Sequence, residues 1–368
     1  MSVTKATVHV CATISLLVLM VETVRAQSAL ALYGELDGGL AWLNNVGGRR
    51  QYKVTSGLID GSFWGLQGFE DLGGGSKAIF QIERGLSMTS GNSLDDHPFY
   101  VGISSETLGT VTIGYQYDPI HDYLAPFTMT GGTGGTAFAH PFDNDNANNS
   151  YLAHNALKYE SQSFSGLRFG GMYALSNAAG RFSNNRAYGV GASYQDGPLN
   201  AGAAWLHVSG VGSNESGAYD AMTMYGAQRS VFDAIVQSRD SYGVGVTYAF
   251  SGVTLGGAWS RSTFTEITDS NGGSEMPSMG FSNYELNAAF QLMPSVSLAG
   301  SYTYTKGSNQ HWHLGGIQAV DRLSKRTDVY AEAIYQRSSN DAPALINGSD
   351  PSSSRNQLLV GAGIRHRF

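Results

Sequence analysis

The chain has 368 residues and a net charge of −7, and 14% of its residues are charged, 11% are aromatic and 48 are glycine. Its mean hydropathy is −0.17. The negative charge disfavours a nucleic-acid partner. Beyond the N-terminus, no run approaches the roughly 18–20 apolar residues that a membrane-spanning helix needs. A membrane protein with this composition would have to be a β-barrel with a wet interior.

The N-terminus has the pattern of a secretory signal peptide. Lys5 precedes an apolar stretch over residues 8–21, and residues 24–26 place small side chains at the spacing of a signal-peptidase site. We expect cleavage after residue 26, which leaves a single domain over residues 27–368. Cys11, the only cysteine of the sequence, lies in the removed segment. The mature chain is therefore expected to have no disulfide and no cysteine metal site.

The rest of the chain alternates large apolar residues with small or polar ones at a period of two, which is typical of strands with two different faces. In residues 30–42 the leucines oppose Glu35 and Asp37, and residues 242–250 repeat the pattern with tyrosine and valine. The last stretch ends on Phe368, as the closing strand of a barrel could. A soluble β-sandwich is the alternative, although it would not normally have this signal and this terminus.

Short connections alternate with long ones along the chain, which is the pattern of outer-membrane barrels. The long ones are residues 44–61, 87–96, 118–150, 176–186, 209–240, 266–281, 306–313 and 339–356. Eight long loops join sixteen strands in an up-and-down arrangement. The sequence thus predicts an all-β fold, a 16-stranded antiparallel transmembrane β-barrel with long external loops. A barrel of this size encloses an aqueous channel.

Several stretches, in order over nearly the whole mature chain, match one family. They are Leu32-Tyr33-Gly34, Trp64-Gly65-Leu66, Glu70-Asp71-Leu72-Gly73-Gly74-Gly75, Tyr117-Asp118-Pro119, Leu323-Ser324-Lys325-Arg326-Thr327 and Gly363-Ile364-Arg365-His366. The chain resembles the trimeric general porins of Gram-negative bacteria, of the betaproteobacterial type. The resemblance implies a homotrimer among outer-membrane lipid and lipopolysaccharide, with no cofactor. It implies passive diffusion of ions and small hydrophilic solutes, and a third long loop that folds into the barrel.

That third loop, residues 118–150, is acidic and has no Lys or Arg. Its carboxylates are Asp118, Asp122, Asp143 and Asp145. In the family, basic residues on the barrel wall oppose such a loop, and this chain departs from that pattern. The departing positions are Glu35, Phe63, Gln67, His97 and Leu152. We therefore expect a pore that prefers cations, because the basic half of its electrostatic filter is depleted.

Five more charged residues are expected on inward faces of the wall, namely Asp37, Lys77, Glu83, Lys158 and Arg168. Lys77, Lys158 or Arg168 could replace the missing positive charge, which is the alternative to a cation preference. Residues 143–146 open like a calcium loop but lack its later glycine and glutamate, and His311 and His313 lack a third ligand, so no metal site is expected.

Two other functions stay open. A barrel enzyme would need a nucleophile and a base within reach of one another, and no spacing of Ser and His singles out such a pair, so we expect no catalytic residues. A substrate-specific or adhesin-like barrel would use the long loops 209–240 and 339–356, and the sequence leaves this alternative standing.

Overall fold

The structure is a computed structural model, and it describes residues 28–94, 97–213, 216–219, 234–269, 274–339 and 342–368. The expected signal peptide lies outside the described residues. The strands are β1 Ser28–Val46, β2 Arg49–Ser56, β3 Ser62–Gly73, β4 Ser76–Leu86, β5 Ser93–Leu94, β6 Phe99–Ser105, β7 Gly109–Gln116, β8 Ala153–Glu160, β9 Leu167–Ala174, β10 Arg186–Asp196, β11 Leu199–Ser209, β12 Ala234–Phe250, β13 Val253–Asp269, β14 Glu275–Met276, β15 Met279–Gln291, β16 Val296–Lys306, β17 His311–Arg322, β18 Thr327–Ser338 and β19 Asn356–Arg367.

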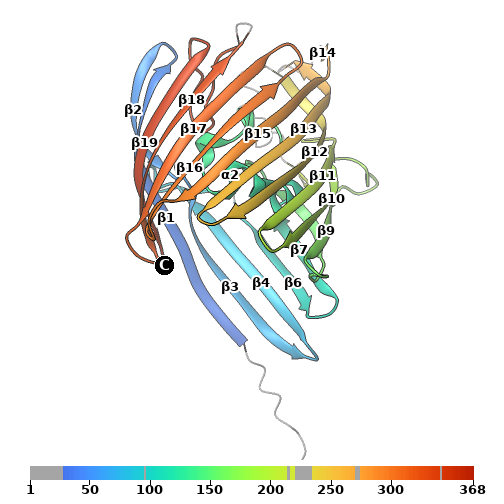
Figure 1. The fold of residues 1–368 in the computed structure, drawn as a ribbon. Helices are drawn as coiled ribbons and strands as arrows, with labels where there is room; N and C mark the ends of the chain where they lie inside the picture. The colour runs from blue at the N-terminus through green and yellow to red at the C-terminus, as the bar shows by residue number, and fades with distance from the viewer. Residues whose placement is uncertain (1–27, 95–96, 214–215, 220–233, 270–273, 340–341) are drawn as a thin grey trace, which may run out of the picture.

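These strands form one closed antiparallel sheet (Figure 1). The short strands β2, β5 and β14 continue β3, β6 and β15, because each pair shares one neighbour, namely β1, β4 and β13. The barrel closes where β1 pairs with β19, from Glu35 opposite Arg367 to Leu43 opposite Leu359. The predicted 16-stranded antiparallel barrel is therefore confirmed. Closure leaves no unpaired sheet edge in the membrane.

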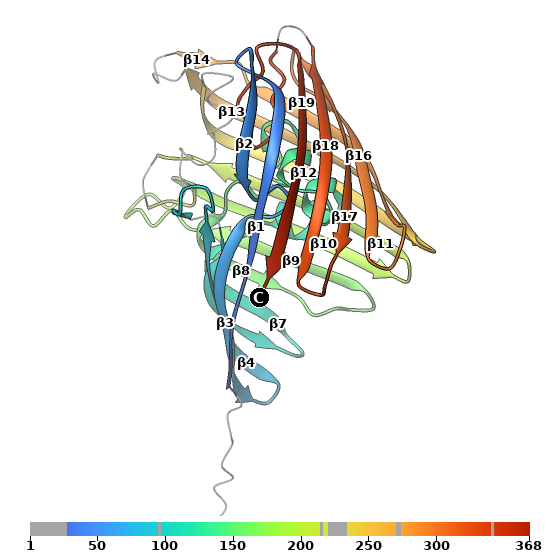
Figure 2. The ribbon, with the colours of Figure 1, turned by 90° about the vertical axis from the view of Figure 1, so that its left-hand side faces the viewer.

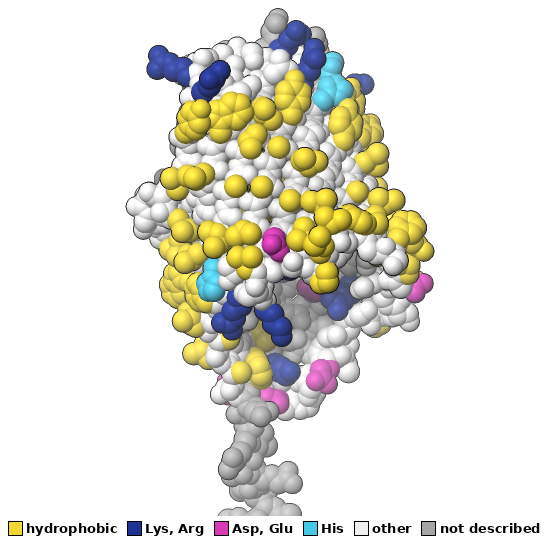
Figure 3. All heavy atoms as spheres, turned by 60° about the vertical axis from the view of Figure 1, so that its left-hand side comes forward, with side chains coloured by type: hydrophobic (Ala, Val, Ile, Leu, Met, Phe, Trp, Pro, Cys, Tyr) yellow, Lys and Arg dark blue, Asp and Glu magenta, His cyan; other side chains and the backbone are white. Residues whose placement is uncertain are grey.

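The two faces of the wall follow the predicted alternation. Leu30, Leu32 and Leu40 on β1 are more than 60% exposed on the outer face, whereas Glu35 and Asp37 between them are buried on the inner face. Figure 3 shows hydrophobic side chains in bands over the outer wall, with Lys and Arg beyond them at both ends. This surface matches a lipid-facing wall between two polar interfaces.

Three predicted loops are wrong in their extent. β12 begins at Ala234, inside the predicted loop 209–240, and β13, β14 and β15 occupy parts of the predicted loop 266–281. Residues 44–61 were expected to be a long loop, but β1 runs to Val46 and β2 begins at Arg49. Gly47 and Gly48, both at positive φ, make a tight turn between the two strands, because only glycine adopts two such conformations readily. The hairpin of β1 and β2 therefore extends the wall at the long-loop end (Figure 2).

The third long loop, residues 118–150, lies inside the barrel, and we call it L3. It contains the helices α1 Pro119–Tyr123 and α2 Met129–Gly132 and the 3-10 turns η1 Ala125–Phe127, η2 Thr136–Phe138 and η3 Pro141–Asp143. Its apolar side chains pack on the inner faces of the wall, so the hydrophobic core lies between L3 and the barrel. None of the helices in the described part of the chain is long and apolar enough to span a bilayer.

Candidate pore and its constriction

L3 begins with a short helix that a buried aspartate caps. The Asp118 Oδ1 atom accepts hydrogen bonds from the backbone N–H groups of Ile120 (2.8 Å) and His121 (3.1 Å), the usual role of an N-cap side chain. Its Oδ2 atom accepts a hydrogen bond from the Asn146 side chain (2.8 Å). Burial raises the pKa of Asp118. This carboxyl group thus joins the start of the loop to its end.

Inward-facing glycines of the wall make room for L3. A Cβ atom placed on Gly191 would lie 2.3 Å from Cδ2 of Tyr123, and one on Gly245 would lie 2.3 Å from Cβ of Phe127. A Cβ atom on Gly202 would lie 2.2 Å from the Tyr123 carbonyl oxygen. Such distances exclude every residue but glycine unless the loop moves. We call Gly191, Gly202 and Gly245 the glycine floor.

A buried histidine between two carboxylates fastens the far part of L3 to the wall. His140 lies 2.7 Å from Asp145 of the loop and 3.1 Å from Glu285 of β15. Glu285 also accepts a hydrogen bond from the backbone N–H of Met129 (2.6 Å), and Asp145 accepts one from the hydroxyl of Ser260. Each member of this triad has a charge-assisted partner, which a buried charge requires.

The electrostatics of the triad make it an ionised cluster. Burial alone would lower the pKa of His140, but the two carboxylates raise it to about 10. Burial alone would raise the pKa of Asp145, but the charge of His140 and the hydrogen bonds lower it below its usual range. At neutral pH the loop is therefore held by an imidazolium ion rather than by a neutral histidine.

The expectation that the four L3 aspartates face the pore is wrong for three of them. Asp118, Asp143 and Asp145 are at most 1% exposed. Asp143 accepts hydrogen bonds from two backbone N–H groups of the loop itself, at 2.9 and 3.1 Å. Asp122 is partly exposed and makes an ion pair with Lys158 of β8. Irregular backbone inside a barrel needs polar partners for its N–H groups, and these carboxylates supply them.

A break in the wall faces L3. Between β2 and β3, residues 57–61 leave the sheet, and the buried Asp37 carboxylate holds them by accepting hydrogen bonds from the backbone N–H groups of Ile59 and Asp60, both at 3.0 Å. The Tyr330 hydroxyl donates to the same carboxylate. Asp37 was predicted to line the lumen, but it is fully buried and supports this segment instead. We call residues 57–61 the wall segment.

Fixed charges of the wall meet in one cluster beside the wall segment. Arg365 contacts Asp60 and lies 3.0 Å from Asp328, and Arg367 lies 2.7 Å from Glu35 and 2.9 Å from Asp328. Glu35 was predicted to line the lumen, whereas the other four residues of this cluster were not predicted. The alternation of β19 already put both arginines on the inner face, so that signal was present.

Most of the other predicted wall residues lie on inner faces. Phe63 stacks on His97, with 4.8 Å between the ring centroids. Glu83 is buried and accepts hydrogen bonds from Tyr33 (2.5 Å) and Gln81 (2.7 Å). Phe63 and His97, two of the positions that depart from the family pattern, therefore lie side by side. Glu83 is hydrogen-bonded to neighbouring wall residues.

The remaining predicted residues differ in position. Lys77, at the short-turn end of β4, lies over the ring of Phe69 at 5.1 Å. Gln67 and Arg168 are exposed, on β3 and β9. Leu152 was expected in the pore, but it is 1% exposed and packs away from water just before β8. Leu152 is apolar, so its burial is favourable.

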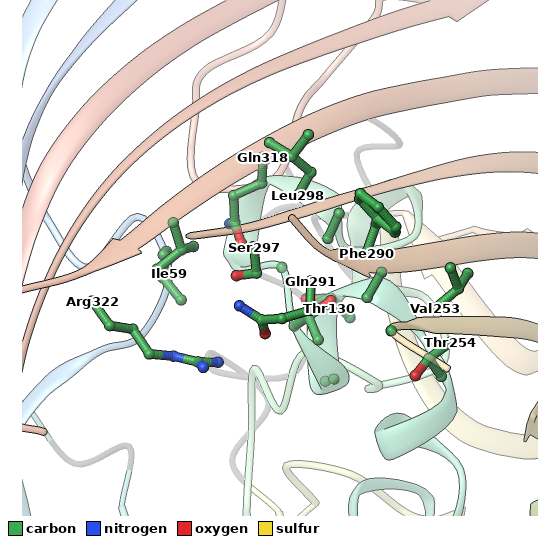
Figure 4. A pocket seen from close by; sticks show the side chains of 18 of the residues that line it. Ile59, Thr130, Val253, Thr254, Phe290, Gln291, Ser297, Leu298, Gln318 and Arg322 are labelled. Carbon is green, nitrogen blue, oxygen red and sulfur yellow. The ribbon is translucent and has the colours of Figure 1, made fainter. Parts of the chain in front are cut away.

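Three cavities that share lining residues lie inside the barrel. The outer vestibule, of about 480 Å³, touches the long loops at Ser87 and Asn347, and the inner vestibule, also about 480 Å³, touches the short turns at Gly252 and Arg322. A middle cavity of about 400 Å³ shares wall and loop residues with both. Figure 4 shows the polar groups of Arg322, Gln291 and Ser297 directed into the inner vestibule.

The middle cavity lies between L3 and the opposite wall. It is lined by Ile59, Asp60, Gly61, His97, Tyr117, His121, Thr130, Gly131, Thr136, Ala147, Asn148, Asn149 and Ser150. Thr130 and Gly131 of L3 also border the inner vestibule, and Thr136 also borders the outer one. A solute crossing the barrel through these cavities would pass the tip of L3.

Comparison with known proteins identifies one family. The family model described as Gram-negative porin matches residues 13–342. An outer membrane porin protein of Bordetella pertussis is 26% identical, with 94% of this chain and 95% of the relative covered. The outer membrane porin protein 32 of Delftia acidovorans is 25% identical, with 93% and 95% covered.

Solved structures share the fold. The anion-selective porin from Comamonas acidovorans superposes with a TM-score of 0.76 at 22% identity, covering 93% of this chain and 100% of that one. OmpT of Vibrio cholerae, described in its trimer form, superposes with a TM-score of 0.65 at 15% identity, covering 93% and 99%. At these identities the likeness concerns the fold alone.

Proposed function

We propose that this chain, which belongs to the Gram-negative porin family, conducts ions and small hydrophilic solutes by passive diffusion through its barrel. It is an outer-membrane protein, as its relatives are. The observation that carries the proposal is the series of three adjoining cavities from the long loops to the short turns. Export with cleavage after residue 26 belongs to the same proposal.

The test is conductance of the refolded mature chain, residues 27–368, in a planar bilayer. We expect ohmic single-channel steps, because polar groups line all three cavities. Protein that is folded by circular dichroism but conducts nothing would contradict the proposal. That result would favour an adhesin-like or substrate-specific barrel, or, less favoured, a barrel enzyme.

We propose that the ion preference at neutral pH is weak. The cation preference was predicted from a wall depleted of basic residues together with four L3 aspartates, of which three are buried and the fourth is paired with Lys158. The structural neighbour from Comamonas is anion-selective, which also gives no support to a cation preference. Among the described residues that line the middle cavity, Asp60 is the carboxylate that could attract cations, and Arg365 pairs with it. A zero-current potential near zero under a KCl gradient would agree.

We propose that three copies associate through the side of the wall where the strands are shortest. The strands β6, β7, β8 and β9 have 7 or 8 residues, whereas β12 and β13 have 17 each. Eight residues rise about 26 Å along a strand and, with a tilt of about 40°, roughly 20 Å across the membrane. That falls short of the apolar band of about 25 Å, so neighbouring copies would shield this side from lipid.

The interface can be tested by placing a charge on it. Ile103 on β6 is 55% exposed on the outer face, and Ile317 on β17 is 69% exposed elsewhere on the outer wall. We expect Ile103→Arg to give monomers in detergent by light scattering, while the matched control Ile317→Arg stays trimeric. Trimers in both variants would contradict this interface.

We propose that the outer wall also binds the phosphates of lipopolysaccharide. Arg261, Lys306 and Arg337 are exposed on β13, β16 and β18 at the long-loop end. Lys306 pairs in register with Ser282, which Arg261 contacts at 3.0 Å. Cations at the headgroup level attract anionic lipids. The variant Lys306→Gln with Arg337→Gln should copurify with less lipopolysaccharide, and an unchanged amount would refute this contact.

A further inference from the structure

One side of the inner vestibule brings three polar side chains together from neighbouring strands. Gln291 of β15, Ser297 of β16 and Arg322 of β17 all point into this cavity of about 480 Å³ (Figure 4). Gln291 lies opposite Ser297 in register, and Ser297 lies opposite Val320, two residues before Arg322. Side chains in opposite and diagonal positions of an antiparallel sheet are within reach of one another. The three polar groups therefore border the same part of the cavity.

Arg322 differs from the two arginines of β19 beside it. Arg365 contacts Asp60 and lies 3.0 Å from Asp328, and Arg367 lies 2.9 Å from Asp328. Arg322 also pairs in register with Asp328, but the carboxylate is held by the two arginines of β19. Within the described ranges, no side chain makes an ion pair or a hydrogen bond with the Arg322 guanidinium group. Its N–H groups are thus open to a ligand in the vestibule.

Ser297 supplies a second donor, and Gln291 does not supply a third. The Ser297 hydroxyl lines the cavity and makes no hydrogen bond to another described residue. The amide nitrogen of Gln291 donates to the backbone carbonyl oxygens of Met293 (2.5 Å) and Val296 (3.0 Å), so it is already occupied. An acceptor with several oxygens would therefore bind between Arg322 and Ser297.

The rest of the inner vestibule offers Arg322 no competing carboxylate. The tip of L3, residues 130–134, contributes only threonine and glycine to the lining. Asp60 is the carboxylate among the lining residues, and it contacts Arg365. Glu332 lies behind the lining, where it is 3% exposed and accepts a hydrogen bond from Gln318 (3.3 Å). A negatively charged group that enters the cavity would thus find the Arg322 guanidinium group unoccupied.

We propose that Arg322 and Ser297 form a binding subsite for the oxyanion of a small solute, a carboxylate or a phosphate. The inference rests on the proposed channel function and names a class of solute that the inner vestibule binds during passage. A guanidinium group binds two oxygens of one carboxylate or phosphate through parallel N–H groups, and the hydroxyl of Ser297 donates to the same group. Chloride cannot use this geometry, so the subsite distinguishes oxyanions from chloride.

The experiment measures how acetate and inorganic phosphate reduce the single-channel KCl current of the full mature protein at pH 7. An occupied subsite obstructs the vestibule, so we expect a saturable reduction. Arg322→Gln should raise the probe concentration for half-maximal reduction about tenfold, because charge-assisted hydrogen bonds are lost. Arg326→Gln is the matched control, since it removes the same charge from an exposed turn outside the cavity, and it should leave that concentration unchanged. A response to acetate alone would assign the subsite to carboxylates, and a response to phosphate alone would assign it to phosphates.

Two further variants test the geometry of the subsite. Arg322→Lys keeps the charge without the planar pair of donors and should weaken binding by several fold, and Ser297→Ala should weaken it about threefold. Equal effects of Arg322→Gln and Arg326→Gln would overturn the inference, because charge at a distance would then explain the reduction. The absence of a saturable reduction by either probe in the unmodified chain would overturn it as well. In both cases KCl conductance persists and the proposed channel stands, whereas an unmodified chain without KCl conductance would end both proposals.

Discussion

Two segments enter the barrel from opposite sides, and they use their carboxylates in opposite ways. L3 carries four aspartates, and three of them are buried, where they bind backbone N–H groups and a histidine. The wall segment, residues 57–61, carries Asp60, whose side chain is 56% exposed toward the middle cavity. The acidity of a loop therefore does not give the field in a pore. The direction of each carboxylate and its partner decide that field.

The largest test of this comparison removes one of the two segments. Deleting most of residues 118–150 should raise single-channel conductance on the order of twofold, because conductance follows the free cross-section and L3 occupies the interior. Shortening the loop between β9 and β10 by deleting residues 178–184 is the control, and it should change little. Unchanged conductance without L3 would mean that the constriction lies elsewhere.

A more local change removes the central cation of the L3 attachment. His140→Ala should destabilise the docked loop by about 3–5 kcal/mol, because two buried carboxylates lose their partner. Thermal unfolding and open-channel noise measure the effect. Adding Asp145→Asn and Glu285→Gln should recover most of the loss, since the buried charges are then gone. Failure of this rescue would argue against the ionised triad.

The glycine floor predicts a smaller effect. Gly202→Ala should cost about 1–3 kcal/mol and give heterogeneous conductance, because the new methyl group would collide with the L3 backbone at Tyr123. Gly315→Ala on β17 is the control, since its nearest neighbour would be 3.7 Å away. Equal stability of the two variants would show that L3 can shift without loss.

The pH dependence of the attachment follows from the same triad. The raised pKa of His140 gives stability that is complete below about pH 6.5 and is lost as the pH rises through about 10. The lowered pKa of Asp145 gives stability that is complete above about pH 4 and is lost in stronger acid. Each pH unit above about 6.5 should remove up to about 1.4 kcal/mol. Open-channel current noise that stays constant up to pH 10 would contradict this loss of stability.

The finest test compares one carboxylate from each segment. Asp60→Asn should raise the ratio of chloride to potassium permeability by less than about twofold, because Arg365 already offsets the charge. Asp143→Asn should leave that ratio unchanged and lower the thermal stability instead, because Asp143 is buried on backbone N–H groups. The opposite pattern, with selectivity responding only to Asp143, would reverse the assignment of roles.

The barrel could be predicted from the sequence because a period of two leaves no freedom within a strand. Once Leu30 and Leu32 face lipid, Glu35 must face inward, and β19 places Arg365 inward by the same rule. Short turns could be found from glycine and proline. The hairpin that β1 and β2 form around Gly47 was missed because a polar hairpin resembles a loop in composition.

For the constriction, the sequence predicted which residues form the loop but not the direction of their side chains. L3 and the residues between it and β8 have no repeating period, so the direction of Asp145 or Leu152 depends on what each one packs against. Asp145 meets Ser260 and His140, and His140 reaches Glu285, far along the chain from the loop. No spacing of residues in the sequence predicts such contacts. The break at residues 57–61 was hidden in the same way, because Asp37 looked like an ordinary inward charge.

The position of L3 has a consequence for the order of assembly. The loop precedes in the chain most of the strands that form its seat, from β8 to β19, although Leu43 of β1 belongs to the same core, and it lies inside the cylinder that these strands complete. Once β1 pairs with β19, the closed wall would obstruct a loop of this size from entering sideways. We therefore expect L3 to be laid against the growing sheet before the seam closes. A substitution in the glycine floor would then slow folding at its last step, the pairing of β1 with β19.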